Sequence, residues 1–309
     1  RYDVIGVTGH VIPVFLLDTD VEGNDPWDRR LTDHLYGGDS YYRLCQETVL
    51  GLGGIGLLNA LGCKPEVYHM NEGHAALLAL ALLEERLAGT PLIEASEADI
   101  EAVRRHCVFT THTPVPAGHD QFGVDQMYQV LGHDRASAIE RAGCLHNGLM
   151  NMTYIAWRFS RFVNGVARQH GKVSRKMFPG YKVDAITNGV HAATWLSPHF
   201  QELFDTEIPN WRTDNQYLRS VYGLDPAQIA ACHVPAKQRL LDVVDRRTGH
   251  PFNPSVLTLG FARRVATYKR ASLLLNDPAR LVAIAEAIGG LQILFAGKAH
   301  PADNAGKGL

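Results

Sequence analysis

The sequence lacks long apolar runs and an excess of charge of either sign. No run reaches the roughly 18 unbroken apolar residues that a membrane span needs, and the start, RYDVIGVTGH, does not have the layout of a signal peptide. Lys and Arg number 30 against 32 Asp and Glu, so the formal net charge is -2. Without a general positive field the chain is not expected to bind nucleic acid or a membrane, and any phosphate must be bound by a local group of cations.

Cysteines are also scarce, and none stands in a Cys-x-x-Cys pair. An odd number at wide spacing argues against a disulfide framework or a zinc site and predicts reduced thiols in the cytoplasm. The cysteines are Cys45, Cys63, Cys107, Cys144 and Cys232. The HExxH spacing of a metal-binding helix is absent too, so we expect no metal.

What the sequence does have is an alternation of strand and helix patterns over 309 residues, enough for about two domains. Strands are predicted at 11–17, 66–70, 107–113, 183–190, 254–261 and 291–297. Helices are predicted at 39–62, 75–89, 136–170, within 211–248, and at 269–290. This order predicts an α/β fold whose last three elements form a βαβ unit, with the domain boundary between Asn188 and Pro254.

The run GLGGIG, residues 51–56, matches the dinucleotide-binding pattern GxGxxG. That pattern works on a tight turn between a strand and a helix, whereas these glycines follow the helical run RLCQETV. We therefore expect no dinucleotide site. The glycines indicate close helix packing or a break in the backbone over a ligand.

Polar side chains lie at the carboxyl ends of three predicted strands. Asn71, Glu72 and His74 come directly after the second strand, His112 lies in the last residues of the third, and Asn188 in the last residues of the fourth. Ligands of α/β sheets bind beyond the carboxyl ends of parallel strands, so these residues are expected to share a cleft. Glu72 is placed to orient His74, although Asn71 and Glu72 can equally be helix caps.

The strand at 254–261 leads into ARRVATYKR, which sets Arg263, Arg264, Lys269 and Arg270 within eight residues. Such a cluster suits phosphate, because Arg and Lys donate charge-assisted hydrogen bonds. A solvated basic turn that caps the sheet is the alternative reading. Together with neutral groups that can bind sugar hydroxyls, the cations suggest glycosyl transfer to or from phosphate.

With these motifs in hand, the chain resembles the α-glucan (glycogen, starch and maltodextrin) phosphorylases, in particular their short bacterial branch. The resemblance rests on LYGGD, RLCQE, HMNEGHA, TTHTPVPAGHD, NGVARQH, AITNGVHAATWL, GFARRVATYKR and GKAHP. It implies two Rossmann-like lobes of the GT-B type facing a cleft. The implied reaction is phosphorolysis of the terminal α-1,4 bond of a glucan to α-glucose 1-phosphate, with retention of configuration and pyridoxal 5'-phosphate as cofactor.

The resemblance also implies a domain layout. Residues 1–188 are expected to be the main part of the N-terminal lobe, 189–253 connecting helices and loops, and 254–309 the start of a truncated C-terminal lobe. Both ends are expected to be cut from a longer protein, because family members carry a region with regulatory or oligomer contacts before the first strand. The full-length protein is accordingly expected to form a homo-oligomer.

Roles carry over by position. Arg264 and Lys269 resemble the catalytic pair that binds substrate phosphate. His112 and Asn188 resemble residues that hold glucosyl hydroxyls, and the main chain of His112 is expected to support the developing oxocarbenium charge. The further substrate-binding positions are Glu72, His74, Asp39 on the entry loop and the supporting Arg43. Trp195 matches a position near the cofactor, where packing is its other reading.

One departure from the family matters most. The lysine that forms the Schiff base follows GKAHP in family members, and neither Lys298 nor Lys307 matches it. The 309 residues alone are therefore expected to lack cofactor and turnover. Two other functions stay open: a nucleotide-sugar-dependent GT-B glycosyltransferase and a non-catalytic glucan-binding remnant.

Overall fold

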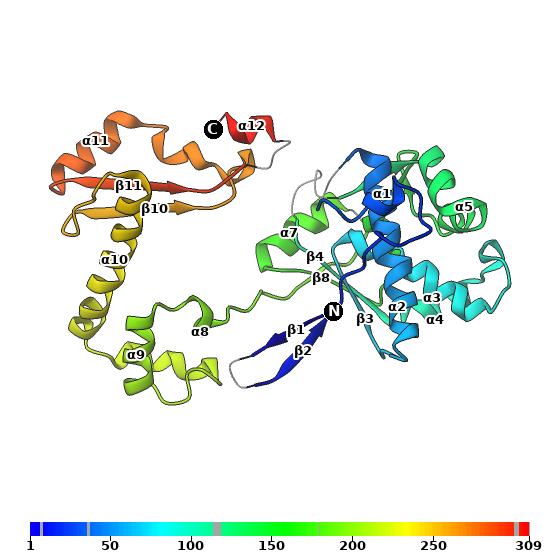
Figure 1. Ribbon diagram of the computed structural model, residues 1–309, viewed down its shortest axis with the longest axis horizontal. Coiled ribbons are helices and arrows are strands. Elements are labelled where there is room, and N and C mark those ends of the chain that lie inside the picture. The colour runs from blue at the N-terminus through cyan, green and yellow to red at the C-terminus, as the bar shows by residue number, and fades with distance from the viewer. Residues whose placement is uncertain (7–8, 36–37, 114–118, 179, 300–302, 309) are drawn as a thin grey trace. The chain divides into compact units, whose positions relative to one another are not determined.

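The computed structural model describes residues 1–6, 9–35, 38–113, 119–178, 180–299 and 303–308 (Figure 1). The chain divides into two compact units, Arg1–Gly189 and Val190–Leu309. Each unit combines helices with a parallel sheet, which confirms the α/β class. None of the helices in the described ranges has both the length and the apolar character needed to cross a bilayer.

The first unit is built on a parallel sheet with the strand order β3-β4-β8-β9. Its strands are β3 (Tyr68–Asn71), β4 (Cys107–Thr111), β8 (Phe162–Gly165) and β9 (Asp184–Ala185). Most of β4 is buried, as expected for a central strand of a parallel sheet. Because all four strands run the same way, their carboxyl ends meet at one edge.

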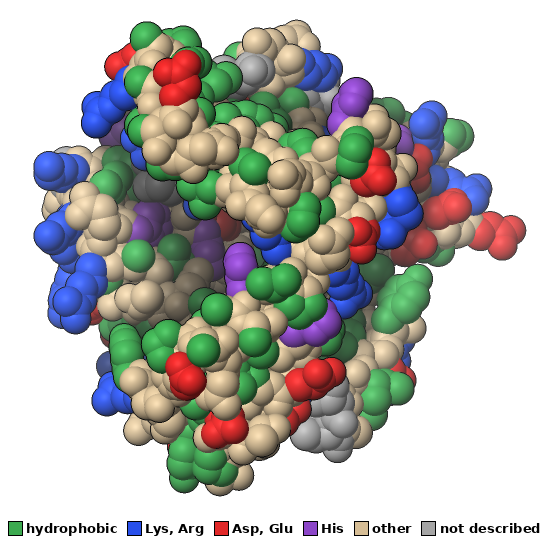
Figure 2. All heavy atoms as spheres, turned by 90° about the vertical axis from the view of Figure 1, so that its left-hand side faces the viewer, with side chains coloured by type: hydrophobic (Ala, Val, Ile, Leu, Met, Phe, Trp, Pro, Cys, Tyr) green, Lys and Arg blue, Asp and Glu red, His purple; other side chains and the backbone are tan. Residues whose placement is uncertain are grey.

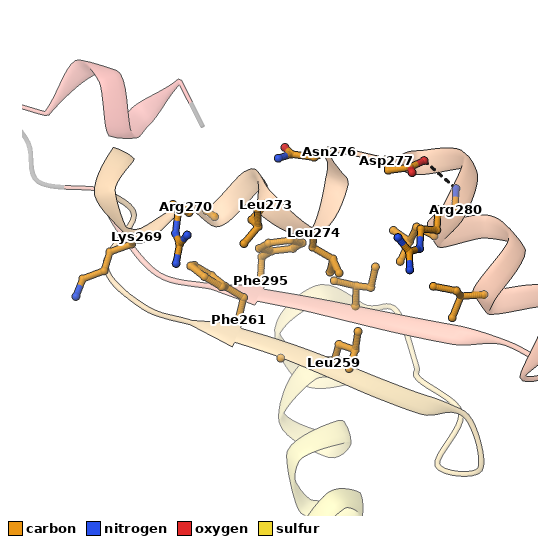
Figure 3. A pocket seen from close by; sticks show the side chains of 15 residues that line it. Leu259, Phe261, Lys269, Arg270, Leu273, Leu274, Asn276, Asp277, Arg280 and Phe295 are labelled. Carbon is orange, nitrogen blue, oxygen red and sulfur yellow. Dashed lines mark hydrogen bonds between the residues drawn. The ribbon is translucent and has the colours of Figure 1, made fainter. Parts of the chain in front are cut away.

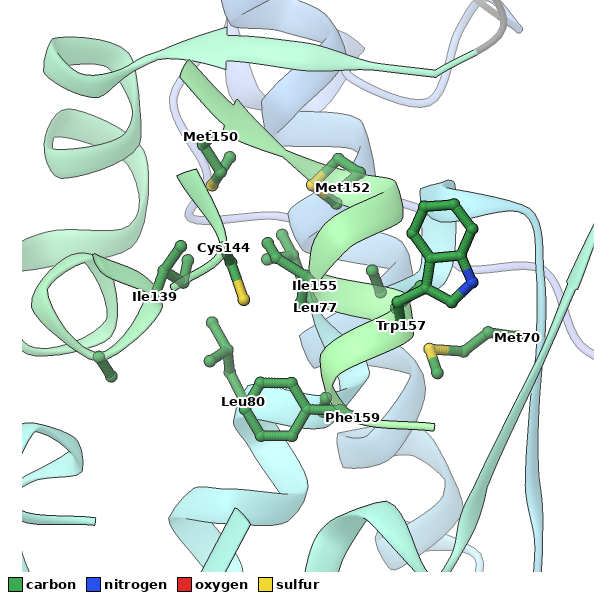
Figure 4. Close-up of a cluster of buried hydrophobic side chains, with 14 of the residues drawn as sticks. Met70, Leu77, Leu80, Ile139, Cys144, Met150, Met152, Ile155, Trp157 and Phe159 are labelled. Atoms are coloured by element: carbon green, nitrogen blue, oxygen red, sulfur yellow. The ribbon is translucent and has the colours of Figure 1, made fainter. Parts of the chain in front are cut away.

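Helices pack around this sheet and supply most of the core. They are α1 (Ser40–Thr48), α2 (Gly54–Ala60), α3 (Leu78–Leu87), α4 (Glu97–Arg104), α5 (Val124–Arg141), α6 (Met152–Arg158) and α7 (Arg168–Met177), with short 3₁₀ turns η1 (Asp28–Arg30), η3 (Gly73–Ala75) and η4 (Leu92–Glu94). Helix α3 is apolar on nearly every side, so it is buried: Leu80 and Leu83 are each 1% exposed. Leu80 belongs to the same buried cluster as Ile155 and Trp157 of α6, and Figure 4 shows it beside Phe159.

The predicted helix at 39–62 is confirmed, but one π-helical turn, η2 (Val49–Gly53), lies between α1 and α2. Gly51 in this turn packs closely against the start of α3: an added Cβ would lie 2.8 Å from the Cβ of Leu77, the residue before that helix. The GLGGIG run is therefore a helix-packing motif, and the strand-to-turn context of a dinucleotide site is not present there.

Two sequence-based predictions in this unit are wrong. The predicted helix at 136–170 holds three strands, β6 (Leu145–His146), β7 (Leu149–Asn151) and β8, with α6 between β7 and β8. The reason is the turn Asn147–Gly148, where both residues have positive φ, +51° and +75°, as a tight hairpin requires. β7 also pairs with β5 (Gln121–Gly123).

The predicted strand at 11–17 is shorter than expected and lies outside the parallel sheet. It is β2 (Val11–Val14), which pairs antiparallel with β1 (Tyr2–Ile5) in a separate hairpin. An apolar run alone does not tell a hairpin strand from a buried parallel one, and the side chains of both strands are in fact exposed.

The second unit begins with helices and ends with the predicted βαβ arrangement. Its elements are α8 (Ala192–Trp195), α9 (Pro198–Glu207), η6 (Asn215–Gly223), α10 (Pro226–Thr248), β10 (Leu257–Ala262), η7 (Thr267–Lys269), η8 (Ala271–Leu275), α11 (Pro278–Ala287), β11 (Leu291–Ala296) and α12 (Asn304–Lys307). β10 and β11 pair in parallel, which confirms the unit. The crossover helix starts later than predicted, at Pro278, because Asp277 caps it and proline favours the first helical turn.

The core of the second unit is small, with Phe204, Ile208 and Trp211 buried together. Its strands keep apolar side chains exposed, such as Leu257 at 53% and Phe295 at 45%. The face in Figure 2 carries apolar side chains and charges of both signs.

Candidate active site

The candidate site is the edge of the first unit's sheet where its parallel strands end. Glu72 directly follows β3, His112 directly follows β4, and Asn188 lies three residues beyond β9. His170 lies in the first turn of α7, which follows β8; it is buried, and its Nδ1 accepts a hydrogen bond from the N–H of Val166 at 3.1 Å. Glu72, His112 and Asn188 therefore follow β3, β4 and β9, the three strands near which they were predicted.

Glu72 is the most constrained residue at this edge. Its backbone has φ +64° and ψ 174°, a conformation that residues other than glycine rarely adopt. The residue is 7% exposed. One carboxylate oxygen accepts a hydrogen bond from the main-chain N–H of His112. The other, Oε2, is buried without a hydrogen-bond partner among the described residues. Such strain, with a spare acceptor, is typical of functional positions.

Two detailed expectations for this segment are corrected by these contacts. Glu72 stands at the N-cap position of η3, but its side chain makes no capping hydrogen bond there. His74 is oriented by other residues: its Nδ1 lies 3.0 Å from Oδ2 of Asp120 and 2.8 Å from Nη2 of Arg43.

His74 belongs to a set of four ionisable side chains, Arg43, Glu47, His74 and Asp120, which we call the charged cluster. Arg43 and Glu47 lie one turn apart on α1, with 3.0 Å between Nε and Oε1. Arg43 also reaches Asp120, with 3.2 Å between Nη2 and Oδ2, and Nδ1 of His74 lies 3.5 Å from Oε1 of Glu47. The charged cluster thus joins α1, the end of β3 and the segment before β5.

The charged cluster shifts the pKa values of its members in different directions. Burial raises the pKa of Glu47 to about 7, although a hydrogen bond with His74 opposes the shift. Hydrogen bonds with Asp120 and then Glu47 raise the pKa of His74 to about 9. Burial would raise the pKa of Asp120, but hydrogen bonds with His74 and Glu47 outweigh it and hold that pKa well below its usual value.

Glu47, His74 and Asp120 also have the composition of a metal site, since their ligand atoms lie within 4.8 Å of one another. The guanidinium of Arg43 already contacts both carboxylates, at 3.0 and 3.2 Å. A second cation would be repelled by it, so the arrangement favours an ion-pair network over a metal site.

Asp39, Asn188 and Trp195 have simpler surroundings. Asp39 is the N-cap of α1 and accepts a hydrogen bond from the N–H of Tyr42 at 2.9 Å. Asn188 is exposed, and its N–H donates to the carbonyl of Val166 at 3.0 Å. Trp195, at the end of α8 in the second unit, is 79% exposed.

The cationic segment lies in the second unit, just after β10. Arg264 is exposed, and Lys269 ends η7 with its Nζ 4.7 Å from the ring centroid of Tyr268. Lys269, Arg270 and Arg280 line a cavity of about 520 Å³ over β10 and β11. Figure 3 shows that Lys269 extends away from the apolar side chains of this cavity.

The predicted meeting of this cationic segment with His112 and Asn188 stays a prediction, because the two groups belong to different units. Part of the predicted TTHTPVPAGHD motif, residues 114–118, lies outside the described residues.

No role was predicted from the sequence for Glu47, Asp120, His119 and His170, although each lies in one of the motifs that carry the resemblance. His119 is buried, with Nδ1 2.8 Å from the hydroxyl of Thr153, and burial lowers its pKa. Glu47 could have been found, because it follows Arg43 by four residues on a predicted helix. Asp120 ends the TTHTPVPAGHD motif, but its contact with His74 could not be predicted, since only the fold brings the two residues together.

Fold and site together define an α/β protein with a strand-end site built from charged and polar side chains. Comparison with known proteins makes this more specific. Glycogen phosphorylase from Mycobacterium tuberculosis is 34% identical over 348 positions, covering 96% of this chain and 40% of the relative. Maltodextrin phosphorylase from Thermococcus litoralis is 35% identical over 330 positions, with 96% and 39% covered. Glycogen phosphorylase from Aquifex aeolicus is 31% identical over 335 positions, with 95% and 47% covered.

The resemblance to the α-glucan phosphorylases is thereby confirmed: this chain is a sequence relative of glycogen and maltodextrin phosphorylases along nearly all of its length. It spans less than half the length of these relatives. No protein-family model matches the chain.

Proposed function

We propose that the protein is an α-1,4-glucan phosphorylase, a glycosyltransferase that releases terminal glucosyl units as α-glucose 1-phosphate with retention of configuration. Its relatives' names support this reading. The observation that carries it is the hydrogen bond from the main-chain N–H of His112 to buried Glu72, because this bond fixes a strand end where a sugar ring is expected. We further propose the GT-B arrangement of two Rossmann-like lobes, with the domain limits given above.

In this proposal each residue has one task. Arg264 and Lys269 bind the substrate phosphate, as a guanidinium fork and a point charge do well. His112 and Asn188 bind glucosyl hydroxyls, and the carbonyl side of His112 faces the charge that develops at the anomeric carbon. The free oxygen of Glu72 is an acceptor for one further hydroxyl.

Pyridoxal 5'-phosphate is proposed as the cofactor of the full-length protein, but the residues present here do not form its covalent site. A cofactor aldehyde needs an amine held in a desolvated pocket. Among the lysines in the described ranges none is buried, and Lys269 and Lys237 are half-buried at most. No step of the proposal runs through the cofactor, and we propose that the 309 residues alone do not turn over. Trp195 stays a proposed neighbour of the cofactor.

The proposed partners are an α-1,4-glucan, inorganic phosphate and further copies of the protein. We also propose the cytoplasm as its location, because all five cysteines are free thiols, which suits a reducing compartment.

The test is phosphorolysis of maltoheptaose by the full-length protein, with glucose 1-phosphate as the product measured. Arg264→Ala and Lys269→Ala are each expected to raise the KM for phosphate about tenfold or more, the effect of losing a hydrogen bond to a charged group. Arg280→Ala is the matched control, a cation in the same unit that has no proposed role. Glucan binding should stay close to the wild-type value in all three variants.

Two results would contradict the proposal. Consumption of a nucleotide sugar instead of phosphate would favour the related glycosyltransferases, and glucan binding without any product would favour a non-catalytic protein. An unchanged KM for phosphate in both variants would remove the phosphate-binding role.

A further inference from the structure

Glu47 is the least exposed ionisable residue of the charged cluster, and the proposed reaction gives it no role. It is 1% exposed, and its Oε2 has no hydrogen-bond partner among the described residues. A buried carboxylate is stable only if it is paired or protonated. Whether the Glu47 carboxylate carries a proton therefore affects the interactions within the charged cluster.

Among the described residues, charged and titratable groups from three other segments of the chain lie around Glu47, besides Arg43 on its own helix. Arg43 lies on its own helix, His74 comes from η3, and Asp120 comes from the segment before β5. From the segment after η1, His34 lines the same cavity of about 600 Å³ as Glu47. The remaining walls of this cavity are mostly apolar.

The proton on Glu47 decides whether charges in the cluster balance. With the proton present, the cations Arg43 and protonated His74 face a single carboxylate. Once the proton leaves to solvent, two cations face two carboxylates. Because His74 stays protonated up to a pKa of about 9, the balanced state covers the range from about pH 7 to about pH 9.

The cluster is connected to the candidate active site through a short stretch of chain. His74 lies two residues after Glu72, and Gly73 between them packs against the backbone of α6, since an added Cβ would lie 3.3 Å from the carbonyl carbon of Met152. Glu72 therefore has little room to move independently of His74. Glu72 in turn holds the N–H of His112.

We propose that Glu47 is a positioning residue, and that gain or loss of one proton at its carboxylate changes how firmly the charged cluster holds Glu72 and the main chain of His112. The segment is held most firmly when Glu47 has lost its proton. The kinetic part of this inference rests on the proposed phosphorylase activity, whereas the part about the cluster itself does not.

The first test needs no activity. In the full-length protein with isotope-labelled histidine, the NMR titration of His74, assigned with His74→Gln, should show an inflection near pH 7 as Glu47 titrates. In Glu47→Gln this inflection disappears and the proton affinity of His74 falls about tenfold or more, as expected when an opposite charge within about 4 Å is removed. Glu84→Gln, which removes a half-buried partner of Arg135 outside the charged cluster, should leave both features unchanged.

The second test is kinetic. The ratio of wild-type kcat to that of Glu47→Gln should rise roughly fivefold or more between pH 6 and pH 8, a typical size for a coupling between sites, with little change in the KM for phosphate. Taking a ratio cancels the titration of phosphate itself. Glu84→Gln should give a flat ratio.

The outcomes are distinguishable. A protein without phosphorolysis but with the expected His74 titration would contradict the proposed function and leave the cluster inference supported. A His74 titration without an inflection near pH 7, or unchanged in Glu47→Gln, would overturn the inference. If Glu47→Gln does not fold, the wild-type titration alone decides.

Discussion

Replacing Gly51 with alanine is the sharpest test of the packing in the first unit. An added Cβ at Gly51 would lie 2.8 Å from the Cβ of Leu77 and from the main-chain N of Leu78, which is closer than real Cβ contacts. The main chain of a buried helical segment cannot move aside freely, so overpacking should lower the free energy of unfolding by about 1–3 kcal/mol. This loss has to exceed the gain in helix propensity of up to about 1 kcal/mol that alanine brings.

Gly56 is the matched control, because it belongs to the same glycine run but an added Cβ there meets nothing within 4 Å. Gly56→Ala should raise the free energy of unfolding by up to about 1 kcal/mol. Urea unfolding followed by circular dichroism would measure both variants, with opposite shifts of the midpoint expected. A midpoint for Gly51→Ala equal to that of Gly56→Ala would refute the close-packing explanation of the motif.

Two further predictions concern buried side chains. Burial raises the pKa of Cys107 and of Cys144 to about 12, so a thiol reagent at pH 8 should label exposed Cys63 in the native protein and reach the other two only after unfolding, as mass spectrometry would show. Rapid native labelling of Cys107 would contradict its burial. Leu44→Ala should lower the free energy of unfolding by about 2–5 kcal/mol, because Leu44 is 0% exposed, whereas Leu61→Ala at 45% exposure should cost clearly less in the same urea experiment.

Sequence predicted the parts of the fold that have strong local signals. The strand at 107–111 was predictable from an apolar run that ends before a proline, and the βαβ unit from two apolar strands on either side of a helical pattern. The strand Phe162–Gly165 was missed because four residues between two helices give too short a pattern. The Asn147–Gly148 pair was a usable hairpin signal, and recognising it would have divided the predicted helix.

The site was predictable in position but not in its contacts. Glu72 and His112 were found because carboxyl ends of parallel strands share an edge, which is a rule of topology. Their hydrogen bond, and the contact of His74 with Asp120, depend on how loops far apart in the sequence pack together. The spacing of residues along the chain carries no information on such pairs.

The π-helical turn η2 sets the direction in which the side chains of α2, the next part of the same helical run, point relative to those of α1. A π turn contains one residue more than an α turn, so deleting one residue from Val49–Gly53 would leave an unbroken α-helix but rotate α2 by about 100°. Ile55, which is 4% exposed, would then turn from the interior toward water, while Arg43 and Glu47 would keep their places. The extra residue in η2 therefore lets the charged side chains of α1 and the apolar side chains of α2 face different directions within one continuous helical run.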